Sequence, residues 1–339
     1  MRGLRILRAG PGETIQDRGR FGYLRNGIVE SGPMDWIAYD IANRALHNSP
    51  SAAAIEISRG GIEIACEDEP ICVAFAGGGF VWERGGARLP SAAVVRLRPG
   101  ERLAAKDGAW GTWTYLAVEG GIDVPPVLGS RSTYARFNIG GFEGRALRAG
   151  DVLRTFDTDS ATIREGAILS PLLSRPARRV RVVPGPQDDY FTREAVETFF
   201  STPYKISPRF DRMGYWLDGP ALKHAGGFDI VSDGIALGGI QVPGTGQPVV
   251  LLADHQSTGG YPKLGTLARA DIPAFVQRRP GETVHFERCD ANAARKALLE
   301  IYDALEHPPP SRDDVLQNSN LIGGVTAGGD DGPHLSSRA

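Results

Sequence analysis

Residues 112–118 read Thr112-Trp113-Thr114-Tyr115-Leu116-Ala117-Val118, and the glycine pair Gly120-Gly121 follows soon after. Aromatic and β-branched side chains favour strands, and a glycine pair favours the turn after a strand. Two other runs, Val94-Val95-Arg96-Leu97-Arg98 and Val180-Arg181-Val182-Val183, have the same character. The sequence therefore predicts a mainly β protein with few helices.

A short turn pattern occurs three times along the chain. The copies are Arg98-Pro99-Gly100-Glu101-Arg102-Leu103, Arg148-Ala149-Gly150-Asp151-Val152-Leu153 and Arg279-Pro280-Gly281-Glu282-Thr283-Val284. Each copy places glycine where a turn requires a positive φ and then enters an apolar stretch. The pattern is open to two interpretations, a turn that recurs in all-β proteins or a duplicated unit.

Three segments have the apolar spacing of helices. Residues 35–46 repeat Ile37 and Ile41 at i,i+4, and residues 190–200 repeat apolar side chains in the same way. A third helix is predicted after Asp290, whose side chain suits an N-cap.

The length and the composition indicate two domains. The chain has 339 residues, 41% hydrophobic and 23% charged, and a typical domain has ~150 residues. A charged, proline-containing stretch near 174–179 is the best linker candidate. We therefore expect an N-terminal domain over 1–173 and a C-terminal domain over 180–306. In residues 307–339, three prolines follow His307 and the chain continues as a Gly/Asp/Ser-rich tail, which predicts disorder.

Charge, cysteine and histidine usage argue against several classes of protein. The formal net charge of −2 provides no basic field for nucleic acid or an anionic membrane. The three cysteines cannot pair evenly, which indicates reduced thiols and a cytoplasmic location. The longest apolar run, residues 249–253, is too short to cross a bilayer, and the six histidines lack metal-ligand spacing, so no metal site is expected. Phosphate-loop, G-x-S-x-G and H-E-x-x-H motifs are absent from the sequence.

The densest polar cluster is Asp254-His255-Gln256-Ser257-Thr258-Gly259-Gly260-Tyr261-Pro262-Lys263, directly after the predicted buried strand 248–253. Asp254 could accept a proton, Tyr261 could donate a hydrogen bond and Lys263 could stabilise an oxyanion. We expect a hairpin here that gathers these groups around one carbonyl.

Lys263 is one of only five lysines in the chain, at 106, 205, 223, 263 and 296. A lysine within a polar cluster provides a compact charge with a pKa that its surroundings can shift. The carboxamides of Gln187, Gln241 and Gln256 suit an amide, urea or lactam, because a Gln side chain matches both the donor and the acceptor edge of such a group.

Seven segments in order carry a resemblance to one family. They are Thr14-Ile15-Gln16-Asp17-Arg18-Gly19-Arg20, Ser31-Gly32-Pro33-Met34-Asp35, Ala42-Asn43-Arg44, Gly141-Phe142-Glu143-Gly144-Arg145-Ala146-Leu147, Gly185-Pro186-Gln187, Asp211-Arg212-Met213-Gly214 and residues 240–263. From about residue 4 to residue 286 the chain resembles the biotin-dependent carboxyltransferase family, which includes 5-oxoprolinase components and the carboxyltransferase domain of urea amidolyase. Phe210 and His47 depart from the family pattern, which usually has a small residue and a glycine there.

The resemblance implies two cyclophilin-like β-barrel domains and a component of an ATP-dependent 5-oxoprolinase, which opens the 5-oxoproline lactam to glutamate. Two partners, of the B type and the A type, would complete that enzyme. Since the chain has no phosphate loop, ATP would bind either at a partner interface or at a site that no motif reveals. One alternative is a carboxyltransferase that acts on urea or a related amide with carboxybiotin from a separate carrier. Another is a non-catalytic partner of a kinase inhibitor.

The candidate site residues fall into three sets. We expect catalytic roles for Asp254, Tyr261 and Lys263, and substrate contacts from Gln187, Arg212, Gln241, Gln256 and Thr258. The remaining motif residues are Gln16, Asp17, Arg20, Ser31 and Asp35.

Overall fold

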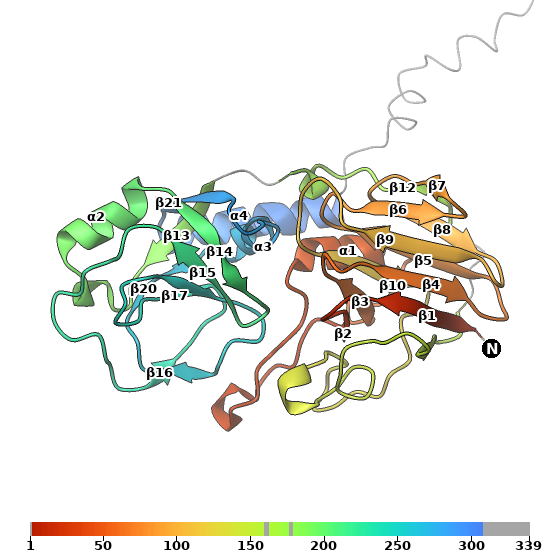
Figure 1. Ribbon diagram of the computed structural model, residues 1–339, viewed down its shortest axis with the longest axis horizontal. Helices are drawn as coiled ribbons and strands as arrows, with labels where there is room; N and C mark the ends of the chain where they lie inside the picture. Colours follow the sequence, from red (N-terminus) through yellow and green to blue (C-terminus); the bar gives the residue numbers. More distant parts are fainter. Residues whose placement is uncertain (1, 159–162, 176–178, 308–339) are drawn as a thin grey trace, which may run out of the picture.

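The computed structural model describes residues 2–158, 163–175 and 179–307. Its strands form two groups that lie side by side, which we call the N-terminal half (2–175) and the C-terminal half (179–307) (Figure 1). The expectation of disorder after residue 307 lies outside the described residues. The structure confirms the mainly β architecture with few helices that the sequence predicts.

The N-terminal half contains two six-stranded sheets. The first has the order β11-β1-β4-β9-β6-β7, with bounds Val152–Arg154, Gly3–Ala9, Ile62–Cys66, Arg102–Lys106, Val81–Arg84 and Ala87–Arg88. The second has the order β12-β8-β5-β10-β3-β2, with bounds Gly166–Ala167, Ala93–Leu97, Ile71–Ala76, Thr114–Val118, Ala54–Ile57 and Thr14–Gln16.

Strand β10 divides its side chains between two cores. Leu116 and Val118 pack into the core of the N-terminal half, where Phe75 and Trp82 stack with ring centroids 4.1 Å apart. Because successive side chains point to opposite faces of a strand, Tyr115 belongs to a second core that includes α1 (Trp36–Arg44) and the C-terminal half. The two halves therefore share buried apolar side chains and form one body.

The C-terminal half is a closed seven-stranded barrel. Its order is β13-β20-β17-β18-β15-β14-β21, with bounds Arg179–Pro184, Lys263–Leu267, Gly239–Gln241, Val249–Leu251, Gly214–Asp218, Tyr204–Phe210 and Thr283–Arg288. The pairing is antiparallel except between β13 and β21, which run parallel. A separate two-stranded ribbon joins β16 (Asp233–Gly234) to β19 (Thr258–Gly259) beside the barrel.

The three predicted helices are confirmed, and each has a side-chain N-cap. Asp35 caps α1, Thr192 caps α2 (Arg193–Ser201) and Asp290 caps α4 (Ala291–Glu306). The sequence analysis did not predict the short α3 or the 3₁₀ turns. Their bounds are Ile272–Val276 for α3 and Leu24–Asn26, Ala135–Phe137, Pro171–Leu173, Asp188–Tyr190 and Arg269–Asp271 for η1 to η5.

The three copies of the turn pattern have the same geometry. Gly100, Gly150 and Gly281 have φ values of 79°, 97° and 84°, as the sequence predicts. In each copy the acidic side chain after the glycine accepts a hydrogen bond from the arginine amide at the start of the turn, at 2.8–3.0 Å. A conformation that favours glycine and a carboxylate that closes the turn explain why the pattern recurs.

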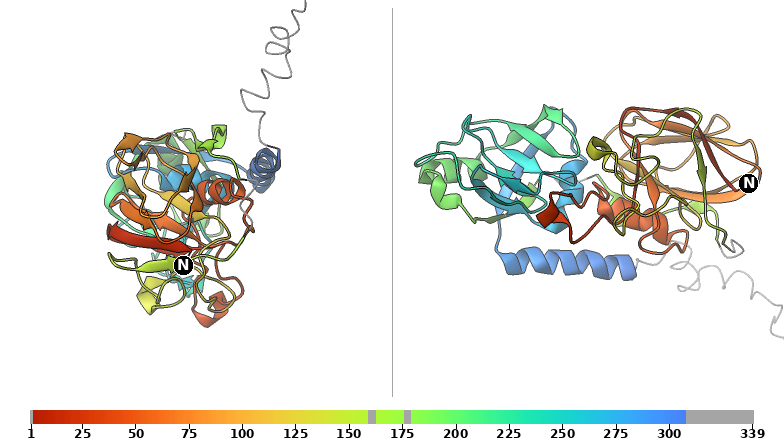
Figure 2. Two further views of the ribbon diagram at one scale, coloured as in Figure 1. Left: turned by 90° about the vertical axis from the view of Figure 1, so that its right-hand side faces the viewer. Right: turned by 90° about the horizontal axis from the view of Figure 1, so that it is seen from below.

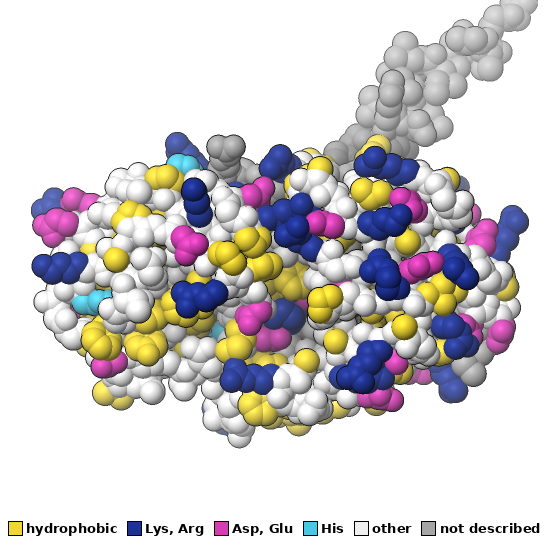
Figure 3. Space-filling model, in the orientation of Figure 1, with side chains coloured by type: hydrophobic (Ala, Val, Ile, Leu, Met, Phe, Trp, Pro, Cys, Tyr) yellow, Lys and Arg dark blue, Asp and Glu magenta, His cyan; other side chains and the backbone are white. Residues whose placement is uncertain are grey.

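Helix α4 runs along the outside of the molecule, past the barrel and toward α1 (Figure 2). Its end is held by an ion pair between Glu306 and Arg44 and by the rings of Tyr302 and Trp36, with centroids 5.5 Å apart. Basic and acidic side chains are interspersed over the face shown in Figure 3. Across the described ranges, no helix is both long enough and apolar enough to span a membrane.

Gln277, after α3, connects the halves through one buried carboxamide that is 4% exposed. Its oxygen accepts hydrogen bonds from the amides of Thr112 and Trp113 at 2.8 and 3.1 Å. Its nitrogen donates to the Asp35 carboxylate at 2.7 Å and to the Trp113 carbonyl at 2.8 Å. Both donors and both acceptor directions of the carboxamide are therefore used across the junction.

We predict that Gln277→Met lowers the free energy of unfolding by at least about 3 kcal/mol, because it leaves several buried groups of the N-terminal half unpaired. Urea unfolding followed by tryptophan fluorescence measures this loss. The matched control is Gln247→Met, since the Gln247 amide makes one hydrogen bond, to the Gly219 carbonyl at 3.2 Å. Equal losses in the two variants would contradict the bridging role.

Candidate active site

Arg212 extends from the turn between β14 and β15 into the N-terminal half. Its Nε and Nη2 donate to the two carboxylate oxygens of Asp254 at 2.8 and 3.0 Å, and Nη2 also donates to the Gly32 carbonyl at 2.8 Å. Its Nη1 pairs with Glu56 of β3. The three side chains are 12%, 11% and 0% exposed for Arg212, Asp254 and Glu56. Arg212 is thus a buried cation between two carboxylates, one from each half.

The electrostatics of this cluster keep Arg212 charged. Burial alone would lower the pKa of Arg212, but the nearby carboxylates of Asp254 and Glu56 raise it above its ordinary value. A buried ion is tolerated only where opposite charges and hydrogen bonds replace its lost hydration. Here every nitrogen of the guanidinium has a partner.

The network continues from Glu56 to the start of α1. The second oxygen of Glu56 accepts hydrogen bonds from the Met34 amide at 2.9 Å and from the Tyr115 hydroxyl at 2.6 Å. The Tyr115 hydroxyl in turn accepts from the Asp35 amide at 2.8 Å. Burial raises the pKa of Asp35 above its usual value, and the Gln277 carboxamide is the neighbour that most offsets this rise. Asp35, predicted as a motif residue, therefore belongs to the junction between the halves.

A cavity of about 640 Å³ lies beside this network. Arg212 and Asp254 form part of its wall, together with Trp113, Tyr134, Arg136, Phe210 and Met213. Its size is within the ~300–1,000 Å³ range of pockets that hold small organic ligands. Phe210, the departure from the family pattern, contributes to the wall of this cavity.

Three of the predicted motif residues hold the loops of the N-terminal half. The Asp17 carboxylate accepts hydrogen bonds from the hydroxyls of Ser130 and Ser132, both at 2.6 Å, and from two backbone amides. The Gln16 carboxamide uses both of its ends within the protein. Arg20 donates to the carbonyls of Val127 and Ser132 at 3.0 and 2.8 Å. Asp17, Gln16 and Arg20 therefore hold these loops in place.

The predicted Lys263 cluster lies at the start of β20. Lys263 has a side chain that is 5% exposed, and its ammonium pairs with Asp233 at 3.0 Å. The Gln187 carboxamide accepts from the Lys263 amide at 3.1 Å and donates to Asp233 at 3.2 Å. This contact with Lys263 lowers the pKa of Asp233, which is 53% exposed. The Lys263 ammonium is therefore buried except on the side that faces the exposed Asp233 carboxylate.

Gln241 and Gln256 adjoin this cluster. The Gln241 oxygen accepts a weak hydrogen bond from Gln256 at 3.4 Å, whereas the buried Gln241 nitrogen has no partner among the described residues. A Cβ at Gly259 would lie 2.3 Å from that nitrogen, so a larger residue there would displace the Gln241 side chain. Thr258, also in β19, is exposed, and Tyr261 is 40% exposed with no hydrogen bond to the described residues. The cluster thus offers one unsatisfied buried donor beside an ammonium.

The expected hairpin is wrong, and the pairing register shows why. Strands β18 and β20 both pair antiparallel with β17, so they run in the same direction on either side of it. The segment from Asp254 to Lys263 is therefore a crossover that returns along the barrel. Lys263 pairs with Gln241 at the end of β17, whereas Asp254 follows the end of β18, which lies beside the start of β17. The structure brings Lys263 together with Gln187, and Asp254 together with Arg212, but it does not bring Asp254 to Lys263.

The sequence analysis missed Glu56, Gln277 and Tyr134. A signal existed for Glu56, which is a single charged residue within the apolar run Ala53-Ala54-Ile55-Glu56-Ile57. A lone charge in such a strand is buried with a partner or faces solvent, and the sequence alone does not say which.

The described part of the chain contains no cluster of metal-ligating side chains. Within the described residues no group of three or more His, Cys, Asp or Glu side chains is arranged to hold a metal ion. His255, within the crossover, contacts the Gln256 carbonyl through Nδ1 at 2.6 Å, and burial lowers its pKa below the ordinary value.

Comparison with known proteins identifies the family. The family described as carboxyltransferase domain, subdomain A and B, matches residues 26–288. The C-type 5-oxoprolinase component of Escherichia coli (strain K12) is 37% identical over 301 residues, which cover 87% of this chain and 94% of the relative. The chain belongs to this carboxyltransferase-domain family. Within the family, it matches the C-type component of 5-oxoprolinase over nearly the whole length of that protein.

Urea amidolyases match one segment of much longer chains. That of Saccharomyces cerevisiae is 33% identical over 324 residues, which cover 88% of this chain and 17% of the relative. The solved structure of the Kluyveromyces lactis urea amidolyase is 29% identical, with a TM-score of 0.84, and the match covers 92% of this chain and 20% of that one. A Kluyveromyces lactis urea carboxylase structure gives a TM-score of 0.83 at 29% identity, over 92% of this chain and 30% of that one.

We predict that Arg212→Met lowers the free energy of unfolding by about 3–5 kcal/mol, because it leaves the carboxylates of Glu56 and Asp254 buried without a counter-charge. Arg209→Met is the control, since the Arg209 guanidinium lies over the Trp216 ring at 4.3 Å, a contact expected to contribute only about 0.5–1 kcal/mol. Thermal and urea unfolding of both variants measure the difference. A loss below about 1 kcal/mol in Arg212→Met would contradict the description of this network.

Proposed function

We propose that this chain is the C-type component of an ATP-dependent 5-oxoprolinase, which opens the lactam of 5-oxoproline to glutamate together with partner proteins. The observation that carries the proposal is the match to 94% of the C-type 5-oxoprolinase component of Escherichia coli, compared with 17% of the yeast urea amidolyase. A chain that corresponds to a whole component of an enzyme is expected to do the work of that component.

The Lys263 end of the crossover is the proposed substrate site. Opening a lactam develops negative charge on the carbonyl oxygen, and a nearby ammonium stabilises such an oxyanion. Among the described residues, the only ionic partner of Lys263 is the exposed carboxylate of Asp233, which a substrate can displace. The unsatisfied Gln241 nitrogen supports amide recognition, with Gln187, Gln256 and Thr258 beside it. Tyr261 is the proposed hydrogen-bond donor from the exposed side.

We assign Asp254 a positioning role in place of a catalytic one, and we assign Arg212 the same role in place of a substrate contact. All nitrogens of the Arg212 guanidinium are already hydrogen-bonded, and Asp254 accepts two of these bonds. These two residues fix one end of the crossover whose other end carries Lys263.

The partners follow from the same proposal. Proteins of the B type and the A type would complete the 5-oxoprolinase, and ATP would bind at an interface with a partner. We also propose a cytoplasmic location, which the free thiols of Cys66, Cys72 and Cys289 support.

The test is Lys263→Met in the complex reconstituted with its partner proteins. We predict a fall in kcat of about 10²–10³-fold, the loss typical of removing one group that stabilises an oxyanion. The measurement is ADP release that depends on 5-oxoproline. Lys296→Met, in which the lost ammonium is on α4 with a side chain 80% exposed, should retain the full rate.

A normally folded Lys263→Met complex that turns over at the rate of the control would remove Lys263 from the proposed site. Absence of any 5-oxoproline-dependent ADP release from the unmodified complex would reject the proposed function itself.

A carboxyltransferase that uses carboxybiotin from a separate carrier is the second candidate. The cavity of about 640 Å³ beside Arg212 favours it, because this space is large enough for a bicyclic cofactor and a small amide. The likeness to the Kluyveromyces lactis urea carboxylase structure points the same way.

Supplying carboxylated biotin carrier and urea to the chain and its partners distinguishes the two candidates. Formation of allophanate without 5-oxoproline turnover would support the carboxyltransferase. The 5-oxoprolinase proposal predicts that no allophanate forms and that glutamate appears only when 5-oxoproline and ATP are present.

A further inference from the structure

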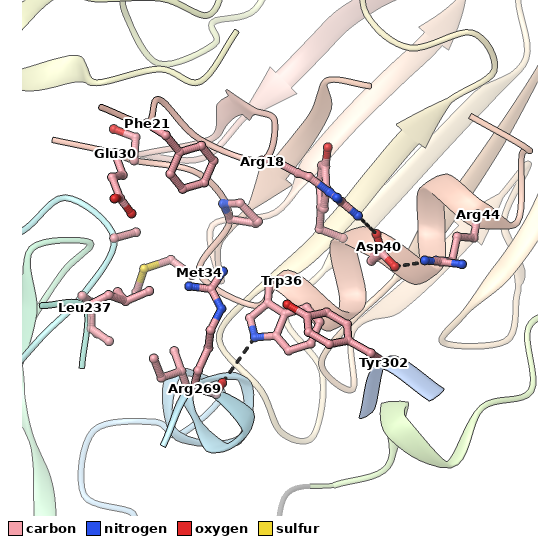
Figure 4. A pocket seen from close by; sticks show the side chains of 16 residues that line it. Arg18, Phe21, Glu30, Met34, Trp36, Asp40, Arg44, Leu237, Arg269 and Tyr302 are labelled. Atoms are coloured by element: carbon pink, nitrogen blue, oxygen red, sulfur yellow. Dashed lines mark hydrogen bonds and ion pairs between the residues drawn. The ribbon is translucent and has the colours of Figure 1, made fainter. Parts of the chain in front are cut away.

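A second cavity lies at the junction of the halves and is distinct from the cavity beside Arg212. It measures about 240 Å³, and the segment Leu252-Ala253 lines it, whereas the next residue, Asp254, lines the other cavity. Figure 4 shows its walls, which come from the loop before α1, from α1, from η5 and from Tyr302 of α4. The two cavities share no lining residue.

Three arginines line this cavity, and two of them are neutralised. Arg18 and Arg44 both bind the carboxylate of Asp40, at 3.1 and 2.5 Å, and Arg44 also binds Glu306 at 2.8 Å. Arg269, in η5, differs from both. Its carbonyl accepts a hydrogen bond from the Trp36 indole at 3.4 Å, but its guanidinium has no hydrogen bond or ion pair with any residue that the structure describes. The side chain extends toward Met34 inside the cavity (Figure 4).

One carboxylate of the cavity is also free of an ionic partner. Glu30 lies beside Phe21 in the wall of the cavity (Figure 4), and its carboxylate makes no hydrogen bond or ion pair within the described chain. The charge of Glu30 acts to raise the pKa of His255, but the burial of the ring has the larger effect. Burial lowers the pKa of His255, so its ring is neutral near pH 7 and does not compensate the charge of Glu30. The cavity therefore presents one unpaired cation and one unpaired anion.

The same two charges line an adjoining cavity of about 380 Å³, which Leu237 and Ile272 also border. Between the charges the surface is apolar, with the side chains of Met34 and Leu237. Phe21 lies at the edge and is 58% exposed. The space of 240 Å³ is below the ~300–1,000 Å³ of sites that hold drug-sized ligands, which limits the occupant to a small molecule.

We propose that this junction cavity binds a zwitterionic α-amino acid with an apolar side chain. The carboxylate of the ligand pairs with the Arg269 guanidinium, for which a bidentate contact is available. Its ammonium pairs with Glu30, and its side chain packs against Met34, Leu237 and Phe21. The proposal concerns a site separate from the Lys263 cluster and does not depend on the proposed function.

The probe is L-leucine, measured on the full chain by isothermal titration calorimetry and by saturation-transfer difference NMR. Two analogues separate the charges, because 3-methylbutylamine lacks the carboxylate and 4-methylpentanoate lacks the ammonium. We expect binding of L-leucine at millimolar concentrations and at least about tenfold weaker binding of both analogues, the factor for one lost charge-assisted hydrogen bond.

Variants assign the two contacts. Arg269→Met and Glu30→Gln should each weaken L-leucine at least about tenfold. Since Arg269 is exposed and Glu30 is half-buried, both variants should fold. Arg269→Met should also abolish the preference for L-leucine over 3-methylbutylamine. Glu30→Gln should abolish the preference for L-leucine over 4-methylpentanoate. Arg295→Met on α4 removes an exposed arginine outside the cavity and should leave binding unchanged.

Failure of the unmodified chain to bind L-leucine at millimolar concentration would overturn the proposal. So would binding that Arg269→Met and Glu30→Gln leave unchanged, or equal binding of L-leucine and either analogue. None of these results bears on the 5-oxoprolinase assay, which reports on the Lys263 cluster.

Discussion

The buried guanidinium of Arg212 is the constraint on which the arrangement of the two halves depends. It comes from the barrel, and it neutralises Glu56 in β3 of the N-terminal half and Asp254 at the start of the crossover. Neither carboxylate has another cationic partner among the ion pairs of the described residues. Separating the halves would therefore expose an apolar core and also leave charges to be hydrated or neutralised. Asp35, at the start of α1, donates its amide hydrogen to the Tyr115 hydroxyl and accepts a hydrogen bond from Gln277 after α3, which extends the same junction to both helices.

This junction determines where the functional residues lie. The crossover from Asp254 to Lys263 is anchored at one end by Arg212 and at the other by pairing with β17. Its two ends face different surroundings, a roomy cavity at Asp254 and a compact polar cluster at Lys263. The segment Leu252-Ala253 before it separates the larger cavity from the smaller one that contains Arg269. One connection thus borders three places where a small molecule could bind.

Local features of the sequence predicted much of the fold. The predicted strands, the spacing of α1, the N-cap of α4 and the three glycine turns each depend on neighbouring residues, so the sequence alone could predict them. The hairpin was wrong because strand order is a long-range property. Strand β17 lies between β18 and β20, although it precedes both in the chain. Gln277 lies in a polar segment, Gln277-Arg278-Arg279, and only the distant backbone of Thr112 and Trp113 explains its burial.

The sequence also assigned Lys263 and Gln187 to the same site, and the structure places these two residues in contact. Their catalytic roles stay a prediction.

A double-mutant cycle between Arg212 and Glu56 tests the central claim most directly. Unfolding free energies of the unmodified chain, Arg212→Met, Glu56→Gln and the double variant give the coupling between a side chain of each half. We predict that the double variant is more stable than the sum of the single losses implies, with a coupling of at least about 2 kcal/mol. Arg212→Met leaves the Glu56 carboxylate buried without a counter-charge, and this cost is absent when residue 56 is already Gln. A coupling below about 0.5 kcal/mol would show that the two halves are held together without this ion pair.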